Sequence, residues 1–390
     1  MRRVRLKEIG TFYSGLSGKS KSDFSEGNAL LVTYRNIFNN PVLNPAIKDT
    51  VVVGKDEKQN EVLWGDILIT GSSETPADAG MSSVVLFNPQ EKMYLNSFCF
   101  GFRLNDMNEA LPSYIGHLLR STSIRAAISK TAFGVTRFNV NRMRFADIEI
   151  PLPPLNIQKE IVSILDSFTS LIGKMKQEVE MRKKQMEYYR EKLMAPQTNW
   201  KIKTLGEIGT FTRGNGLQKS DFRVKGFPCV HYGQIHTYYN TCIYKTKSFC
   251  EEDLAKKLQK ASYGDLLIAT TSEDVKACCK AAVWFGAGDV AYSGDSFCYS
   301  HDQDPKYMAY LFQTEMFAKQ KQKAATGAKV IRVSGESMAS FSFAFPPLVQ
   351  QRQIASILDT FESYISKLEK IIELRQKQYE YYREKLLTFE

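Results

Sequence analysis

Histidine and cysteine are the residue types most often used for metal binding and nucleophilic catalysis, and this chain has four of the first and seven of the second. Cys229, His231, His236 and Cys242 are close in sequence, but their spacing matches no zinc finger or zinc knuckle. The cysteines are odd in number, scattered, and never spaced with two residues between them, which favours reduced thiols over a disulfide framework. We therefore predict neither a metal site nor a disulfide network.

Two other segments have a loose likeness to an enzyme. The glycine-rich segment 285–288 and the later Asp304-Pro305-Lys306-Tyr307 resemble the cofactor loop and the catalytic box of adenine methyltransferases. Too few residues separate them for the strands and helices of a doubly wound fold. The chain also has no phosphate-binding loop and no nucleophile elbow. We therefore predict no catalytic site and no cofactor held by this chain.

The remaining candidates are basic, aromatic, amide and hydroxyl side chains in loops. Arginine and lysine neutralise phosphates or bind guanine edges, and asparagine and glutamine bind adenine edges. One such residue is most often ordinary surface, but a whole set on a chain of net charge +10 and pI about 9.0 indicates nucleic acid. The predicted DNA-binding residues are Lys19, Lys21, Tyr34, Arg35, Asn36, Ser72, Ser73, Arg137, Asn139, Asn141, Arg142, Gln218, Lys219, His231, Tyr232, Gln234, His236, Thr271, Ser272, Lys276, Lys329 and Arg332.

A repeated segment must position these loops. Residues 153–194 return as residues 346–387, and Tyr-Tyr-Arg-Glu-Lys-Leu closes both copies unchanged. Apolar residues three and four apart predict two long helices, each with one apolar face. Two helices on separate domains would also satisfy the pattern, but matched lengths favour their pairing as a coiled coil. The predicted seam is Ile161, Ile164, Phe168, Leu171, Met175, Val179, Met186, Tyr189, Leu193, Ile354, Ile357, Phe361, Tyr364, Leu368, Ile372, Tyr379, Tyr382 and Leu386.

The parts between the helices repeat as well. Leu6-Lys7-Glu8-Ile9 is matched by Leu205-Gly206-Glu207-Ile208, and a Gly-Asp turn that leads into an apolar strand occurs at 65–66 and at 264–265. We predict an α+β fold with two globular domains in tandem repeat, each followed by one of the long helices; if the helices pair antiparallel, the two halves are related by a pseudo-two-fold axis. The expected boundaries are 1–155 for the first domain, 156–195 for the first spacer helix, 196–348 for the second domain and 349–390 for the second helix.

No apolar stretch approaches 18 residues, and the basic start is not followed by an apolar run. We therefore expect no membrane span and no signal peptide, and a cytoplasmic location.

Three features together resemble one family. These are Leu-x-Glu-Ile near the start of each half, Pro-Pro-Leu-x-x-Gln before each long helix (Gln158 and Gln351), and Tyr-Tyr-Arg-Glu-Lys-Leu at each helix end. They resemble the specificity subunit of type I restriction-modification systems, and the likeness covers essentially the whole chain.

The resemblance implies a non-catalytic subunit that reads double-stranded DNA with two target recognition domains, which are separated by a long antiparallel two-helix coiled coil. Its implied partners are two methyltransferase subunits, which bring S-adenosylmethionine, and possibly two motor-nuclease subunits. Two reading heads on a spacer would contact half-sites roughly 10 base pairs apart, each about four base pairs long, with roughly six unread base pairs between them. Since the loops differ between the halves, the target should be asymmetric and bipartite.

Two alternatives remain. The chain could be a stand-alone DNA methyltransferase, which would bind S-adenosylmethionine by itself. It could also be a scaffold that binds only proteins through its coil, and it would then fail to bind any duplex even with a methyltransferase partner.

Overall fold

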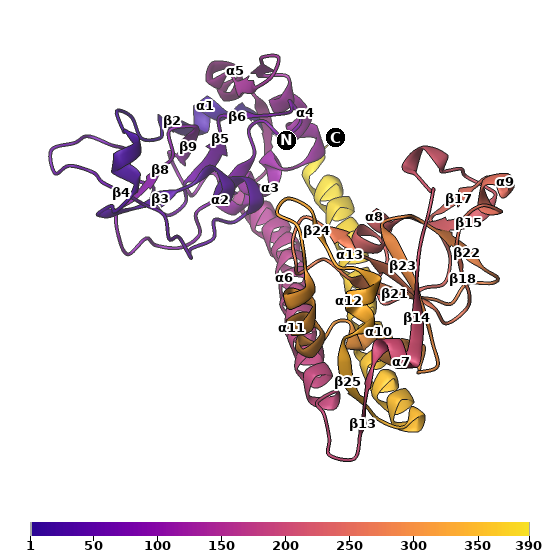
Figure 1. Cartoon of the computed structure of the whole chain (residues 1–390). Coiled ribbons are helices and arrows are strands. Elements are labelled where there is room, and N and C mark those ends of the chain that lie inside the picture. Colours follow the sequence, from indigo (N-terminus) through magenta and orange to yellow (C-terminus); the bar gives the residue numbers. More distant parts are fainter. Residues whose placement is uncertain (1, 390) are drawn as a thin grey trace. The chain divides into compact units, whose positions relative to one another are not determined.

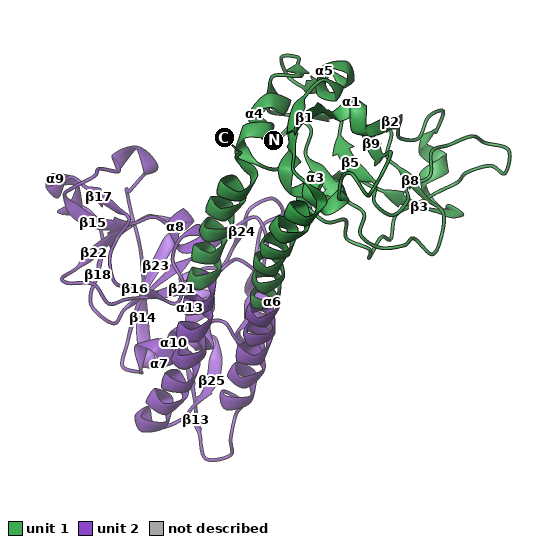
Figure 2. Cartoon of the chain, turned by 180° about the vertical axis from the view of Figure 1, so that it is seen from behind, with its two compact units in different colours: residues 1–176, 370–390 green, residues 177–369 purple. Residues whose placement is uncertain are grey.

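The computed structural model describes residues 2–389 (Figure 1). The chain divides into two compact units, each of which takes part of both long helices. Unit 1 comprises residues 1–176 and 370–390, and unit 2 comprises residues 177–369 (Figure 2). The long helices are α6 (Leu155–Leu193) and α13 (Leu348–Leu387), which confirms both predicted helices.

Unit 1 contains a four-stranded antiparallel sheet of order β2-β9-β5-β7, a three-stranded sheet of order β4-β3-β8, the small sheet β10-β11-β6, and the pair β1–β12. Its strands are β1 (Arg2–Arg5), β2 (Gly10–Ser14), β3 (Ala29–Val32), β4 (Thr50–Val51), β5 (Ile67–Thr70), β6 (Ser72–Ser73), β7 (Ser82–Val84), β8 (Met93–Leu95), β9 (Cys99–Leu104), β10 (Ala132–Phe133), β11 (Phe138–Val140) and β12 (Glu149–Leu152). Its short helices are α1 (Leu6–Ile9), η1 (Lys21–Phe24), α2 (Tyr34–Asn39), α3 (Pro112–Leu119), α4 (Thr122–Ser129) and α5 (Arg142–Ala146).

Unit 2 repeats this arrangement. Its main sheet has the order β14-β23-β19-β21-β16, its second sheet β17-β15-β22-β18, and its pairs are β13–β25 and β20–β24. The strands are β13 (Lys201–Thr204), β14 (Gly209–Arg213), β15 (Phe227–Val230), β16 (Cys242–Ile243), β17 (Ser248–Cys250), β18 (Lys260–Ala261), β19 (Leu266–Ala269), β20 (Thr271–Ser272), β21 (Lys280–Trp284), β22 (Val290–Tyr292), β23 (Ser296–His301), β24 (Ile331–Arg332) and β25 (Ser342–Phe345). The short helices are α7 (Leu205–Ile208), η2 (Lys219–Asp221), α8 (Tyr232–Thr237), α9 (Glu252–Ala255), α10 (Pro305–Leu311), α11 (Glu315–Ala324) and α12 (Gly335–Ala339).

The Gly-Asp turn fixes the central strand of each unit. Gly65 and Gly264 have φ of 85° and 93°, a left-handed conformation that glycine adopts without strain. The fully buried carboxylate of Asp66 accepts hydrogen bonds from the backbone amide of Leu63 at 2.8 Å and from the guanidinium of Arg103 at 2.8 Å. Pairing and hydrogen bonds offset much of the cost of removing this charge from water, whereas an unpaired carboxylate at this position would be strongly destabilising. The turn therefore places the apolar strand β5 in the core.

The two long helices pack on each other in both units. In unit 1 the rings of Phe168 and Tyr382 stack with centroids 5.5 Å apart, and in unit 2 the equivalent rings of Phe361 and Tyr189 stack at the same distance. As the residue number on α6 rises from Phe168 to Tyr189, the number of the stacked residue on α13 falls from Tyr382 to Phe361. The helices are therefore antiparallel, as predicted.

The predicted seam is wrong at four positions. Ile164, Leu171, Ile357 and Tyr364 are 42–45% exposed, and the residue that follows each of them is buried in its place. The physical reason is that each helix faces its globular core as well as the other helix, so the buried face is turned by one position. The other seam residues are buried or half-buried, as expected.

The retained motifs hold the helices to the units. The side chain of Gln158 is fully buried; its amide donates to the carbonyls of Glu109 (2.9 Å) and Pro153 (2.8 Å), and its oxygen accepts from the amide of Leu111 (2.9 Å). In unit 2, Gln351 likewise donates to the carbonyl of Pro346. Because these amides are paired with backbone groups inside the protein, a substitution would leave buried polar groups without partners.

The closing Tyr-Tyr-Arg-Glu-Lys-Leu segments contact the short helices. In unit 1, Glu384 accepts a hydrogen bond from the amide of Thr122 at 2.8 Å, at the start of α4. In unit 2, Glu191 accepts from the amide of Glu315 at 3.2 Å, at the start of α11. A carboxylate at a helix N-terminus satisfies free amides and complements the helix dipole. The same contact in both units gives a physical reason for the identity of the two segments.

One turn is built differently in the two units. Gly80 has φ +68°, and its equivalent in unit 2 is Cys279 with φ +61°. A Cβ on Gly80 would lie 2.6 Å from Cγ2 of Ile128 on α4, whereas the equivalent of Ile128 in unit 2 is the flexible Lys321. Unit 2 therefore has room for the Cys279 side chain, at the cost of a left-handed conformation.

We expect Gly80→Ala to destabilise unit 1 by about 1–3 kcal/mol, because it adds left-handed strain and a close contact with Ile128. Cys279→Gly should destabilise unit 2 less than this, because relief of strain opposes both the loss of the buried thiol contacts and the larger chain entropy of glycine. Thermal or denaturant unfolding of both variants checks this. A neutral Gly80→Ala together with a strongly destabilising Cys279→Gly would contradict it.

Candidate nucleic-acid interface

Unit 1 gathers several of the predicted residues around one pocket of about 580 Å³. Tyr34 comes from the first turn of α2, Ser72 and Ser73 form β6, and Arg137 precedes β11. The Arg137 side chain donates to Oγ of Ser72 at 3.0 Å and stacks over the ring of Phe98, 5.3 Å from its centroid. The pocket therefore combines an aromatic wall, hydroxyl groups and a fixed guanidinium.

Other predicted residues of unit 1 are exposed but do not line this pocket. They are Lys21, Arg35, Asn139 and Arg142, and Arg142 donates to Oγ of Ser14 at 2.8 Å. An exposed cation can still bind a phosphate, because that contact needs charge and reach more than a pocket.

Three predicted residues of unit 1 have structural roles. The Lys19 side chain is 8% exposed and forms an ion pair with Glu57. Asn36 accepts hydrogen bonds from Asn40 and from the amide of Asn44, and Asn141 caps α5 by accepting from the amide of Arg144. These side chains are already paired within the unit and would have to exchange partners to bind DNA.

Unit 2 has a pocket of about 450 Å³ beside Tyr232, which is the equivalent of Tyr34. It brings together Gln218, His231 and Tyr232 of the predicted set, and adds Arg213 and Asp295. His231 caps α8 through its Nδ1, which accepts from the amide of Gly233 at 3.2 Å. Burial, and then the nearby charge of Lys219, lower the pKa of His231, so its ring is neutral at pH 7.

The remaining predicted residues of unit 2 also form two groups, those with structural roles and those that are exposed. Gln234 donates to Oγ of Ser248 at 2.7 Å, and Nε2 of His236 lies 2.9 Å from the carbonyl of Thr271, so both hold the fold together. Thr271 and Ser272 form β20, which pairs with β24. The exposed members are Lys219, Lys276, Lys329 and Arg332.

The two pockets also contain Phe98 and Arg213, which are outside the predicted set. Phe98 lies in Ser97-Phe98-Cys99, which returns as Ser296-Phe297-Cys298, and it is 58% exposed beside Arg137. Arg213 ends β14 and donates to the carbonyl of Gly294 at 3.1 Å. The only signal in the sequence is a cation at a strand end, which is too common to select one residue.

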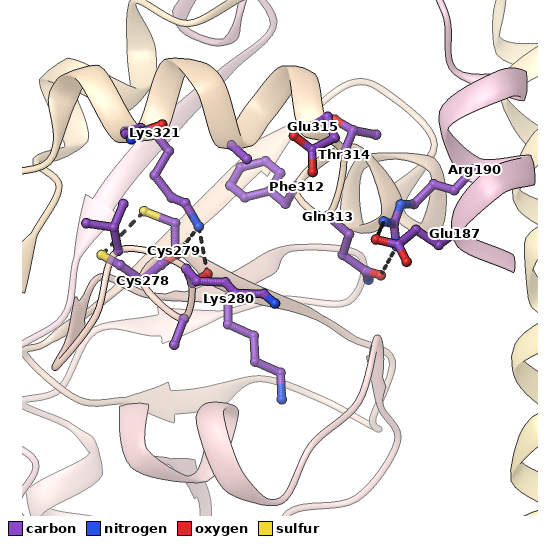
Figure 3. A pocket seen from close by; sticks show the side chains of 15 residues that line it. Glu187, Arg190, Cys278, Cys279, Lys280, Phe312, Gln313, Thr314, Glu315 and Lys321 are labelled. Atoms are coloured by element: carbon purple, nitrogen blue, oxygen red, sulfur yellow. Dashed lines mark hydrogen bonds and ion pairs between the residues drawn. The ribbon is translucent and has the colours of Figure 1, made fainter. Parts of the chain in front are cut away.

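A cavity of about 530 Å³ in unit 2 is lined by Lys321, Cys278 and Cys279 among others (Figure 3). Lys321 of α11 reaches the carbonyls of Lys276 and Cys278 at 2.9 and 2.8 Å. In unit 1, Arg125 of α4 donates to the equivalent carbonyls of Ala77 and Ala79, so this cation has a structural counterpart.

Cys278 and Cys279 lie at the same cavity as free thiols, with their sulfur atoms 3.9 Å apart. Within residues 2–389, no three His, Cys, Asp or Glu side chains are grouped as metal ligands would be. Over the same residues, no helix is both long enough and apolar enough to cross a bilayer.

Comparison with known proteins identifies the family. The model of the type I restriction modification DNA specificity domain matches residues 1–181 and 197–376. A putative type I restriction enzyme specificity subunit from Haemophilus influenzae is 30% identical over 272 residues, which cover 66% of this chain and 68% of that protein. The EcoR124I/EcoR124II specificity subunit from Escherichia coli is 28% identical over 256 residues, which cover 62% of this chain and 63% of that protein.

Two solved structures share the fold over nearly the whole chain. The type I restriction-modification S subunit from M. genitalium has a TM-score of 0.56 at 15% identity, and the match covers 100% of this chain and 96% of that one. A chain from a study of complex assembly and conformational transition in the type I R-M system has a TM-score of 0.59 at 14% identity, with coverages of 99% and 97%. This chain belongs to the family of type I restriction modification DNA specificity proteins.

Proposed function

We propose that this chain reads a bipartite, asymmetric DNA target, with one half-site for each unit. The observation that supports this best is the contrast between the two copies. The buried glutamines, the aromatic stacks of the helices and the Gly-Asp turns are the same in both units, whereas the surfaces around the two pockets differ.

Comparison of equivalent residues in and beside the two pockets shows this contrast. Tyr34 and Tyr232 begin equivalent helices and are retained. Arg137 of unit 1 is replaced by Val330 in unit 2, and Asn96 by Asp295. An amide and a carboxylate prefer different base edges, because the first both donates and accepts whereas the second only accepts. Two such surfaces should read different base sequences.

The exposed apolar side chains of the long helices provide docking surfaces. Unit 1 exposes Ile164, Leu171, Leu374 and Tyr381, each 42–61% exposed. Unit 2 exposes the equivalent positions of the other copy, Ile357, Tyr364, Met181 and Tyr188. Large apolar side chains gathered on a surface indicate a protein partner. Two equivalent sets support two copies of one partner.

We propose that this partner is the methyltransferase subunit, which would hold S-adenosylmethionine and perform the chemistry. The solved chain of similar fold comes from a study of how a type I R-M system assembles. On this proposal the chain itself supplies recognition and no catalytic group. A motor-nuclease subunit could join the same complex to make a restriction enzyme.

The central experiment exchanges one reading surface. We expect replacement of residues 200–345 by the equivalent segment of a relative to change only one half of the methylated sequence, because the framework of unit 1 is untouched. Methylation mapping in cells that carry either form measures this. If both half-sites changed together, or if the isolated chain methylated DNA without a partner, the proposal would be wrong.

A second prediction concerns docking. Leu171→Asp with Leu374→Asp should remove one methyltransferase subunit from the complex, because two charges would be buried in an apolar interface. Native mass spectrometry or light scattering gives the stoichiometry. Lys176→Asp, at an exposed position outside the set, is the control and should leave two subunits bound. Unchanged stoichiometry in the double variant would exclude this surface.

A third prediction concerns phosphate contacts. We expect Lys329→Gln to weaken binding of all sequences by a similar factor and to reduce the slope of log affinity against log salt concentration by about 1, as for one lost phosphate contact. Binding of the assembled complex to specific and random duplexes at several salt concentrations measures both effects. A change of preferred sequence with an unchanged salt slope would instead assign Lys329 to a base.

A further inference from the structure

Unit 1 exposes two apolar side chains at the tip of a hairpin. Strands β10 and β11 are joined by residues 134–137, and at this tip Phe133 is 58% exposed and Val135 is 90% exposed. Both residues project from a short ribbon and contribute little to the core of unit 1. Their apolar character therefore needs an explanation outside the folding of the unit.

The hairpin is held in one shape at its base. β11 pairs with β6 through Phe138 opposite Ser73, so the ribbon continues the small sheet β10-β11-β6. Gly134 has φ +134°, and a Cβ there would lie 2.0 Å from the carbonyl oxygen of Arg137, so this turn requires glycine. Arg137 is fixed in turn by Ser72 and Phe98. The tip is preorganised.

Exposed cations accompany this hairpin. Arg137 is the last residue of the turn and is exposed, and Arg142 and Arg144 are exposed on α5, which directly follows β11. An apolar protein surface would gain nothing from three guanidinium groups beside it, whereas a DNA backbone would be attracted to them. The charge therefore favours a duplex as the occupant of this surface.

Unit 2 has the same turn with a different tip. Gly327 has φ +100°, and a Cβ there would lie 2.1 Å from the carbonyl oxygen of Val330. The equivalents of Phe133 and Val135 are Thr326 and Ala328, and Lys329 follows them. The backbone of the turn is thus common to both units, whereas only unit 1 presents bulky apolar groups.

We propose that Phe133 and Val135 form an apolar wedge that inserts between two base pairs in or beside the half-site of unit 1, and that unit 2 makes no such insertion. The proposal rests on the DNA reading proposed above. Apolar side chains inserted at a base step partly unstack it and kink the duplex. Because flexible pyrimidine–purine steps unstack most easily, the wedge would add sequence preference at a step that it does not hydrogen-bond.

The test uses the complex assembled with its methyltransferase subunits and duplex targets that carry 2-aminopurine at successive positions. Unstacking should raise the fluorescence at one or two adjacent positions in or beside the unit 1 half-site by roughly threefold or more. Phe133→Thr with Val135→Ala, which installs the side chains of unit 2, should abolish this rise. Thr326→Phe with Ala328→Val should create a rise on the unit 2 side, and Phe133→Trp should keep the original one.

An adenine flipped out for methylation would also brighten its position, but this signal comes from the partner and should persist in the double variant. Since both wedge residues are exposed, the double variant should keep the melting temperature of the parent. Sequence-specific binding with no position that depends on Phe133 and Val135 would overturn the wedge alone. Failure of the parent complex to bind any sequence specifically would overturn the proposed function itself.

Discussion

The apolar faces of two very long helices have to be covered along their whole length, and the rest of the structure depends on how this is done. α6 has 39 residues and α13 has 40, so each is roughly 58–60 Å long at 1.5 Å per residue. Neither helix is covered by the other alone. In unit 1, Leu165 and Ile172 of α6 belong to the same apolar core as Ile67 and Phe102 of the main sheet.

Because both long helices contribute side chains to the core of unit 1, they belong to the folded domain. The core of unit 1 also includes Tyr379 and Leu387 from the far end of the chain. The last helical turns therefore complete the first globular unit, so truncation there would uncover a core that lies early in the sequence. The long helices are part of each folded unit and cannot be treated as a separate spacer. The buried side chains of Gln158 and Gln351 likewise fix the start of each long helix to its own unit.

Much of this can be predicted from the sequence, because periodicity indicates a helix directly. Both long helices, their pairing and the Gly-Asp turns follow from repeated segments and from the spacing of apolar residues, whereas the antiparallel direction follows only from the family resemblance. The predicted seam is displaced at Ile164 and Leu171 because two adjacent apolar residues satisfy the pattern equally when a helix has two neighbours. The segment from Pro112 to Ile128 has the pattern of one helix, but it breaks at Ser121, whose hydroxyl donates to the carbonyl of Leu118.

The candidate interface is harder to predict, because residue type does not reveal which side chains are already paired. Lys19 is neutralised by Glu57, which is 38 residues away, and no local pattern contains that information. Tyr34 and Tyr232 lie in segments whose pattern indicates a strand and loop, yet both begin helices of six residues, too short for any periodicity. Phe98 is not found from the sequence because a large apolar ring is more often buried than exposed, and the residue type alone does not mark the exception.

Comparison of the two units shows which sequence differences the framework tolerates. Arg125 in unit 1 and Lys321 in unit 2 bind equivalent carbonyls from positions that are one turn apart on their helices. The interaction has been kept while the residue that makes it has moved. Because the main cores of the units are separate clusters, a change in one should add to, and not interact with, a change in the other. A protein organised in this way can change surface residues of one unit without a cost to the stability of the other, provided that the helix contacts stay as they are.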